Sequence, residues 1–188
     1  MTGQMTGPAA VRRLASEQLA TAEIAQIRDL MRLAFAEDEH GGFTDDDWQH
    51  ALGGVHFVLD VERAIISHAA VVERELQVDG VPIRTGYVEA VATAPDQQRR
   101  GYGTAVMGAV AEHLAEHYEL GALGTGSQGF YERLGWQTWR GPSHVRTDAG
   151  LVRTADEDGY ILVLLTLSSP DLDLTAPISC EWRPGDVW

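Results

Sequence analysis

The stretch Gln98-Arg99-Arg100-Gly101-Tyr102-Gly103 follows a predicted strand and opens a predicted helix of residues 101–116. Glycines at such a junction let backbone N–H groups turn inward, and a helix N-terminus carries about half a positive charge. Together they predict a pyrophosphate-binding loop. The Gly-Lys-Ser/Thr of a Walker motif is missing, as is the three-glycine spacing of a dinucleotide-binding fold. From these residues alone, a plain glycine-rich turn stays open as the alternative.

The composition excludes several classes of protein. The 188 residues include 28 acids and 14 basic residues, every one of them arginine, and the formal net charge is −14. We expect no nucleic-acid or membrane partner, because both need clustered basic side chains. Mechanisms that use a Schiff-base or P-loop lysine are impossible. The single cysteine, Cys180, permits no internal disulfide and indicates a cytoplasmic location.

The hydrophobic pattern predicts an α+β chain with a disordered leader at residues 1–10 and a single domain at 11–188. Helices are expected from an N-cap at Thr21 to Phe35, from an N-cap at Thr44 to about 52, over 101–116 and over 127–134. Strands are expected over 11–14, 55–61, 64–75, 83–93, 120–124 and 160–167, with a hairpin turn at Asp79-Gly80. Thr44 with Asp47 reads as a capping box. Mobile loops are expected near 37–43 and 143–158.

Longer motifs resemble a known family. Gln98–Gly103 matches the pyrophosphate loop of the GCN5-related N-acetyltransferases, and G-F-Y-E-R-L-G-W at 129–136 resembles their second fingerprint. The stretches 44–56, 86–92, 118–123 and C-E-W-R-P-G-D-V-W at 180–188 resemble the aminoglycoside 2′-N-acetyltransferases within that superfamily. The resemblance implies a central mixed, mostly antiparallel sheet flanked by helices, a splayed parallel strand pair that binds acetyl-CoA, and a homodimer.

The resemblance also implies how acetyl-CoA binds as the co-substrate. The residues implied to bind it are Val91, Ala92 and Thr93 at the pantetheine, and Gln98, Arg99, Arg100, Gly101, Tyr102 and Gly103 at the pyrophosphate. Main-chain N–H groups near Ala92 would polarise the thioester oxygen. Arg99 and Arg100 either add charge complementarity or are simply solvated.

Glu89 and Tyr131 are the implied catalytic residues. Strand alternation places Glu89 on one face with Tyr87 and Val91, where a carboxylate is exposed, paired or functional. The resemblance makes Glu89 the general base, acting through water, because a primary ammonium must lose a proton before it attacks a thioester. A tyrosine on a short helix is usually core, but the fingerprint implies that Tyr131 protonates the leaving thiolate.

Contacts to the acceptor are implied by resemblance as well. They are Asp47, Glu89, Ala90, Gly124, Asp156, Glu157, Asp158, Asp186 and Trp188 with its terminal carboxylate. Converging carboxylates suit a polycationic aminosugar, and a turn at Pro184-Gly185 would bring Asp186 beside the C-terminus. Alternatively, Asp47 only caps its helix, and residues 156–158 form a solvated acidic turn.

Two departures from the pattern lie near the expected acceptor site. Gly42 stands where the family has an acid, with Glu37, Asp38 and Glu39 displaced upstream, and Gly124 stands where many members have serine. The predicted reaction is direct acetylation of the 2′-amine of an aminoglycoside. Another cationic aminosugar (kasugamycin-like), a polyamine, another small amine or a protein N-terminus is the enzymatic alternative, and a module that sequesters a cationic antibiotic is the non-enzymatic one.

The histidines and tryptophans show no further pattern that predicts a site. His113 and His117 have helical i, i+4 spacing without an apparent third ligand, so we expect a surface pair and no metal. His50 and His56 flank the Gly53-Gly54 loop and are expected to support it. The tryptophans are expected in the core or at an interface.

Overall fold

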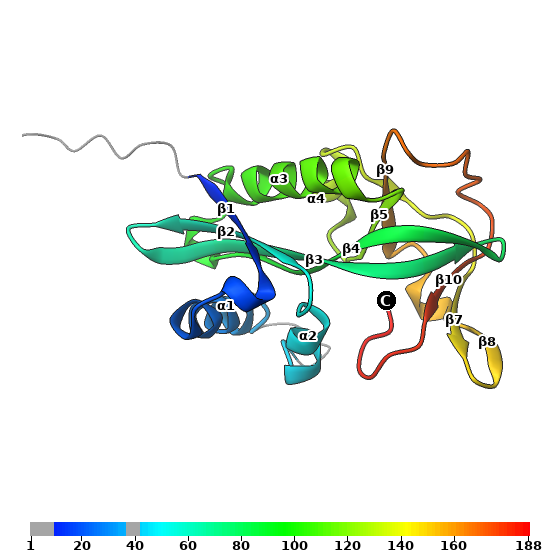
Figure 1. Ribbon diagram of the computed structural model, residues 1–188, viewed down its shortest axis with the longest axis horizontal. Coiled ribbons are helices and arrows are strands. Elements are labelled where there is room, and N and C mark those ends of the chain that lie inside the picture. The colour runs from blue at the N-terminus through cyan, green and yellow to red at the C-terminus, as the bar shows by residue number, and fades with distance from the viewer. Residues whose placement is uncertain (1–9, 37–41) are drawn as a thin grey trace, which may run out of the picture.

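A mixed sheet forms the middle of the molecule in the computed structural model, which describes residues 10–36 and 42–188 (Figure 1). Its strands are β1 (Val11–Ala15), β2 (Val55–Val61), β3 (Ala64–Val78), β4 (Val81–Thr93), β5 (Leu120–Gly124), β6 (Gln137–Thr138), β7 (Ser143–Thr147), β8 (Gly150–Arg153), β9 (Ile161–Leu165) and β10 (Ile178–Glu181). Their order is β6-β9-β5-β4-β3-β10-β7-β8, with β2 and then β1 also joined to β3. Only β4–β5 and β7–β10 are parallel among the described pairs, which confirms the mixed, mostly antiparallel sheet. The predicted leader and most of the loop near 37–43, including the displaced acids, lie outside the described residues.

Helices cover both faces of this sheet. Helices α3 (Tyr102–His117) and α4 (Gln128–Glu132) lie on one face, and α1 (Thr21–Ala34) and α2 (Asp45–His50) lie on the other (Figure 1). Three short 3-10 turns complete the described elements, at Ser16–Gln18 (η1), Pro95–Gln97 (η2) and Ala155–Glu157 (η3). Each face has its own apolar core, the first around α3 and the second around α1 and α2. None of the described helices has both the length and the apolar character that crossing a bilayer requires.

Local capping sets the N-terminal ends of helices α1 and α2. The predicted capping box of α2 is confirmed, since the Asp47 carboxylate accepts from the Thr44 N–H at 2.7 Å and the Thr44 hydroxyl accepts from the Asp47 N–H at 3.2 Å. In α1 the N-cap is Ala20 and not Thr21. Glu23 causes this one-residue shift, because its carboxylate accepts from the Ala20 N–H at 2.9 Å.

The parallel pair β4–β5 separates halfway along its length. Its register runs from Thr85 opposite Leu120 to Tyr87 opposite Ala122, and β4 then continues to Thr93 paired with β3 but no longer with β5. A β-bulge follows the last shared pair, where the register against β3 shifts and Ala90 takes a φ of 50°. Bulges bend a strand and increase its twist. The bend carries β4 away from β5 and confirms the predicted splayed pair.

The expected mobile loop over 143–158 is wrong. Residues 143–147 and 150–153 form the β7–β8 hairpin, and β7 also pairs in parallel with β10 in the C-terminal tail. Strand β8 is exposed along its whole length, so its sequence carries no alternation of buried and exposed positions. Strand β8 pairs with its hairpin neighbour β7, and β7 is held by a strand distant in sequence, since the Arg146 guanidinium donates to the Ser179 carbonyl of β10 at 2.8 Å.

Candidate active site

A cavity of about 1340 Å³ opens where β4 and β5 diverge. The predicted site residues that line it are Asp47, Glu89, Ala90, Val91, Thr93, Gln98, Arg99, Gly101, Tyr102, Gly103, Gly124, Tyr131, Asp156, Glu157, Asp186 and Trp188. The loop before α3 borders the cavity from one face of the sheet, and α2 with the C-terminal tail borders it from the other (Figure 1). Two ligands can therefore meet in the gap between the strands.

The loop before α3 has the geometry of an anion site. Gly101 is the N-cap of this 16-residue helix in a left-handed conformation, with φ 86°, which glycine adopts without steric cost. The Gln98 side chain donates to the Thr93 carbonyl at 3.3 Å and holds the loop against the end of β4. Gly103 packs so closely that a Cβ atom on it would lie 3.2 Å from the Thr93 hydroxyl oxygen. Backbone donors and the positive helix end fit the pyrophosphate of acetyl-CoA.

Substituting Gly103 tests this loop. Gly103→Val should weaken acetyl-CoA binding about tenfold, since the added carbons push the start of α3 away from Thr93 and misalign the backbone donors. Gly108→Val is the matched control on the same helix, because a Cβ atom there meets nothing within 4 Å. Titration calorimetry with acetyl-CoA measures both. Equal affinities of the two variants would contradict the assignment of the loop.

Glu89 lies beside a residue that sequence reasoning missed. Its carboxylate oxygen is 2.5 Å from a guanidinium nitrogen of Arg183, and the two side chains are only 14% and 13% exposed. Burial raises the pKa of Glu89, while the charge and hydrogen bond of Arg183 oppose that rise. A carboxylate with a raised pKa is a better proton acceptor than a solvated one. Arg183 lies inside the tail motif, but nothing local in the sequence indicates that it reaches β4.

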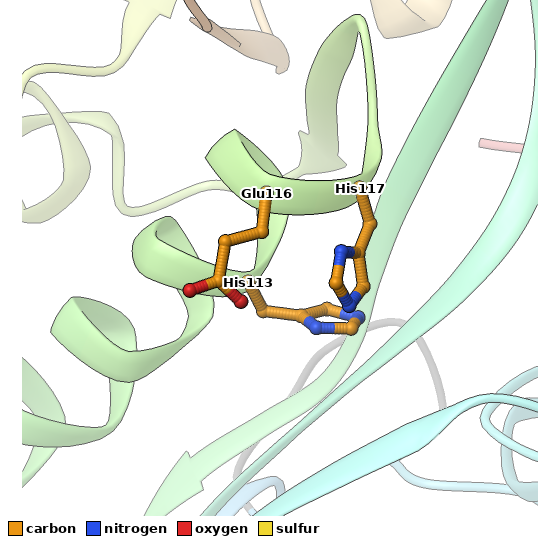
Figure 2. A group of neighbouring side chains, drawn as sticks. All are labelled: His113, Glu116 and His117. Carbon is orange, nitrogen blue, oxygen red and sulfur yellow. The ribbon is translucent and has the colours of Figure 1, made fainter.

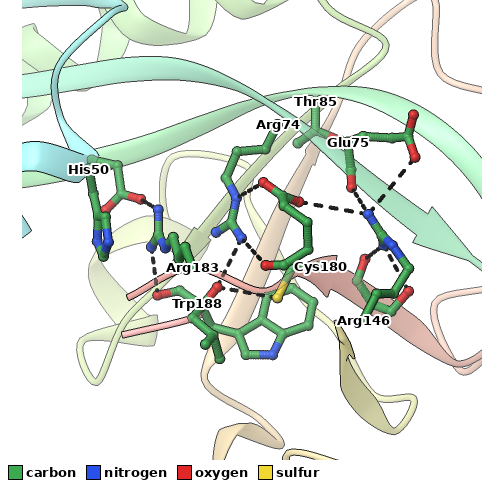
Figure 3. A network of polar contacts seen from close by, with 12 residues as sticks. His50, Arg74, Glu75, Thr85, Arg146, Cys180, Arg183 and Trp188 are labelled. Atoms are coloured by element: carbon green, nitrogen blue, oxygen red, sulfur yellow. Dashed lines mark hydrogen bonds and ion pairs between the residues drawn. The ribbon is translucent and has the colours of Figure 1, made fainter. Parts of the chain in front are cut away.

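Two arginines hold the C-terminal tail against the sheet (Figure 3). Arg74, only 4% exposed, donates to the main-chain carbonyls of Glu181 at 3.1 Å and Val187 at 2.9 Å. Arg183 lies in the tail itself, pairs with Glu89 on β4 and also donates to the Asp186 carbonyl at 2.7 Å. The Asp186 carboxylate accepts from the Trp188 N–H at 3.1 Å, so the structure places Asp186 and the C-terminus together in the cavity.

The acidic residues after β8 lie in two different environments. Asp156 and Glu157 line the cavity, whereas Asp158 is not among the lining residues. Both oxygens of Asp158 accept from Arg153, and that hydrogen bonding lowers the pKa of Asp158 to about 2. Asp158 also accepts from the Ser143 N–H at 3.2 Å, which ties the loop to β7. The structure thus gives Asp158 a structural position and does not bring it to the predicted acceptor site.

Two of the predicted acetyl-CoA contacts also lie outside the cavity lining. Ala92 is buried opposite His68 on β3, and Arg100 is exposed. At the bulge, β4 contributes Ala90 and Val91 to the cavity lining, whereas the resemblance implied a main-chain donor near Ala92. Of Val91 and Ala92, the structure therefore brings only Val91 to the cavity.

Tyr131 on α4 lines the cavity from the α3 side. Its ring packs edge-on against Phe130, with centroids 4.9 Å apart, and against Trp136 at 6.1 Å. Burial raises the pKa of Tyr131 to about 12, so the phenol keeps its proton at neutral pH. The fully buried Tyr87 also contributes to the lining, and among the described residues its hydroxyl has no hydrogen-bond partner.

Gly124 leaves space at the acceptor end of the cavity. A Cβ atom on Gly124 would lie 3.6 Å from the Tyr87 hydroxyl oxygen and 3.6 Å from the carbonyl carbon of Trp188. A serine here would project between these groups. The first departure from the family pattern, Gly42, also lines the cavity. Both departures thus change the shape of the same region.

The histidine pair on α3 differs from the expectation (Figure 2). His113 is buried at 4% exposure, because it packs against Phe57 and Tyr118, so the predicted surface pair is wrong for this residue. Glu116 brings a third polar group within 4.8 Å of the two imidazoles. Its carboxylate is already paired with Arg13 at 3.3 Å, and the cluster is a packed and ion-paired helix face.

The remaining histidines and tryptophans have mixed outcomes. His56 supports the Gly53-Gly54 loop through Ser16, as expected, whereas His50 contacts the Pro184 carbonyl of the tail at 2.7 Å. The tryptophans at 48, 136, 139 and 188 are buried, and Trp182 is 60% exposed.

Comparisons with known proteins agree with this geometry. The family described as an acetyltransferase (GNAT) domain matches residues 16–139. The chain is 43% identical to an aminoglycoside 2′-N-acetyltransferase of Mycolicibacterium fortuitum over 87% of its own length and 86% of that protein.

Solved structures share the fold at low identity. A GNAT family acetyltransferase from Brucella melitensis in complex with acetyl-CoA has a TM-score of 0.58 at 15% identity, covering 91% of this chain and 96% of that one. A GCN5-related N-acetyltransferase from Kribbella flavida has a TM-score of 0.56 at 17% identity, covering 71% of this chain, which spans about a third (34%) of the longer protein. The splayed strands, the glycine loop and these matches agree, and the chain belongs to the GNAT family of acetyltransferases, which use acetyl-CoA.

Proposed function

We propose that this acetyltransferase transfers the acetyl group of acetyl-CoA to the 2′-amine of an aminoglycoside, a modification that confers antibiotic resistance. The observation that carries the proposal is the set of carboxylates of Glu89, Asp186 and the C-terminus, which line the cavity across the sheet from the α3 loop. Aminoglycosides carry several ammonium groups, and such groups bind converging carboxylates by charge-assisted hydrogen bonds. The 43% identity to a relative with this name supports the same assignment.

The proposed mechanism begins with the removal of a proton from the acceptor. Glu89 accepts the proton of the ammonium group through a water molecule, which frees the nitrogen lone pair. The amine attacks the thioester carbon, so that a C–N bond forms and the C–S bond breaks. The Val91 N–H stabilises the negative charge that develops on the thioester oxygen. Tyr131 then donates its proton to the departing thiolate, and the second proton that the attacking nitrogen must lose passes through water to the Tyr131 phenolate and restores the phenol.

The transfer is direct and uses no acyl-enzyme. Cys180 is fully buried, and its thiol donates to the Val187 carbonyl at 3.2 Å. Burial raises the pKa of Cys180 to about 11, which keeps the thiol protonated and a poor nucleophile. It does not line the cavity among the described residues. These contacts support a proton-transfer route in place of a covalent one.

The acceptor is a compact polycation. Asp47, Asp156 and Glu157 add acidic groups to the rim formed by the tail. A kasugamycin-like aminosugar is the second candidate, because Gly42 and Gly124 reshape the acceptor end of the cavity.

We also propose that residues 11–188 act as one domain in a cytoplasmic homodimer. The exposed apolar side chains of Leu151 and Val152 on β8 and of Trp182 support a dimer contact.

A thiol-release assay with acetyl-CoA tests the proposal. Aminoglycosides with a 2′-amine should be acetylated at least about 100-fold faster than matched compounds with a 2′-hydroxyl, because an amine freed of its extra proton by Glu89 is a much stronger nucleophile than a hydroxyl group. Kasugamycin and a polyamine complete the panel. Equal rates on the 2′-amine and 2′-hydroxyl compounds would refute the regiochemistry. Thiol release with kasugamycin alone would favour the second candidate.

A further inference from the structure

A chain of buried hydrogen bonds runs beneath the bulge of β4. The Ser16 hydroxyl lies 2.9 Å from Nε2 of His56, and Nδ1 of His56 lies 2.9 Å from Nε2 of His68. Nδ1 of His68 lies 2.7 Å from the carbonyl oxygen of Ala90. Both imidazoles are completely buried, and the chain joins η1, β2, β3 and β4. It ends on the residue that follows Glu89.

The direction of every bond in this chain follows from its last acceptor. A carbonyl oxygen can only accept, so Nδ1 of His68 carries a proton. Burial lowers the pKa of His68 to about 3 and that of His56 to about 4, so both rings are neutral at neutral pH. Nε2 of His68 therefore accepts from Nδ1 of His56, whose Nε2 accepts from the Ser16 hydroxyl. One set of tautomers satisfies all four groups.

The peptide at the end of the chain is unusual in conformation. Ala90 has a φ of 50°, which costs a residue other than glycine of the order of 1 kcal/mol. Ala90 and Val91 have no register partners on β3, where Glu89 faces Ala70 and Ala92 faces His68. The register with β3 therefore skips this peptide, and the His68 hydrogen bond holds its carbonyl.

The orientation of that peptide decides whether its N–H or its C=O group faces the cavity. In a trans peptide the C=O and the following N–H point in opposite directions, and the described chain has no cis bond. Because the Ala90 carbonyl points at His68, which does not line the cavity, the Val91 N–H points to the other side, and Val91 lines the cavity. A flip of this peptide would replace the donor with a carbonyl.

We propose that His56 and His68 are positioning residues that lock the Ala90–Val91 peptide so that the Val91 N–H faces the thioester of acetyl-CoA. The kinetic test of this inference, which needs an aminoglycoside acceptor, rests on the proposed function, whereas the test by acetyl-CoA binding does not. Neither histidine contacts a substrate. Their role is to make one orientation of the bulge the stable one before acetyl-CoA binds.

Two substitutions of His68 test the proposal. His68→Leu should lower kcat about 10- to 100-fold with a change in KM for the acceptor below about threefold, because a misplaced oxyanion donor affects mainly the transition state. It should also abolish any tighter binding of acetyl-CoA over CoA in calorimetry. His68→Asn should recover most of both, since its amide N–H can replace Nδ1 as the donor to Ala90. His113→Leu is the matched control, a buried histidine away from the bulge, and should keep the wild-type kcat.

Other outcomes overturn the proposal. If the His68→Leu protein folds with a lower Tm but keeps the wild-type kcat, the histidine pair is merely structural. The same conclusion follows if His68→Asn lowers kcat as much as His68→Leu does. Should His68→Leu not fold, nitrogen-15 NMR of the wild-type protein decides, because both rings must carry their proton on Nδ1 and protonated Nε2 refutes the chain. A wild-type protein inactive on every aminoglycoside would remove the proposed function but leave the acetyl-CoA binding and NMR tests intact.

Discussion

Replacing Glu89 with glutamine should lower kcat/KM for the aminoglycoside about 1000-fold at neutral pH, the middle of the range for loss of a general base. The amide keeps an oxygen that can accept from Arg183, so the buried contact at 2.5 Å survives in altered form. What disappears is the ability to accept a proton from the ammonium group. Steady-state kinetics with a 2′-amino substrate measure the loss.

The pH profile separates this chemical role from a structural one. Burial raises the pKa of Glu89, and only the deprotonated form can accept a proton, so wild-type kcat/KM rises as pH increases through that pKa. Glu89→Gln should lack this acidic limb. Glu112→Gln, an exposed acid on α3, is the control and should keep the wild-type profile. A Glu89→Gln rate within about threefold of wild type would exclude Glu89 as the base.

Replacing Arg183 with methionine should move the acidic limb of kcat/KM to higher pH. Arg183 lowers the pKa of Glu89 by charge and by hydrogen bonding, against the rise that burial causes. Without the guanidinium, the carboxyl group holds its proton to higher pH, so less of the enzyme carries a competent base at pH 7. We expect kcat/KM at neutral pH to fall about 100-fold and to recover partly at alkaline pH.

The same substitution should destabilise the fold. Breaking a buried ion pair by removing one partner costs about 3 kcal/mol, and Arg183 also loses its bond to the Asp186 carbonyl. Thermal unfolding measures this loss. Arg140→Met, at an exposed position outside the cavity lining, should change neither Tm nor the profile. When Glu89 is already glutamine, adding Arg183→Met should have no acidic limb of kcat/KM to shift. If Arg183→Met alone leaves the acidic limb at the wild-type pH, the coupling between Arg183 and Glu89 is refuted.

Elements with strong local signals were predictable from the sequence. Strands β2 and β5 have the predicted bounds, and the Asp79-Gly80 turn is present, with φ of 49° and 78° that suit a tight hairpin. The turn also explains why β3 and β4 extend beyond the predicted ends, since Gln77 pairs with Pro82 and Val78 with Val81 up to it. Each of these features depends on neighbours within a few residues.

Elements whose order depends on distant partners were not predictable in this way. The exposed strand β8 has no burial pattern, and β7 is a strand because β10 lies beside it. Arg183 reads as one more surface arginine until the fold brings it to Glu89, which lies 94 positions away. His113 was expected at the surface because i, i+4 spacing says nothing about which side of a helix is covered.

The residues around Gln98–Gly103 predicted, by themselves, a glycine-rich turn that opens a helix and suits an anion, since glycine geometry and a helix N-terminus are local properties. The amino-acid order likewise determined strands such as β2 and β5 and the Asp79-Gly80 turn. The tertiary structure decided how these parts act together. It paired Glu89 with Arg183, placed the C-terminus in the cavity and seated the bulge on His68. Those contacts set burial, charge and peptide orientation, which depend on groups that only folding brings together.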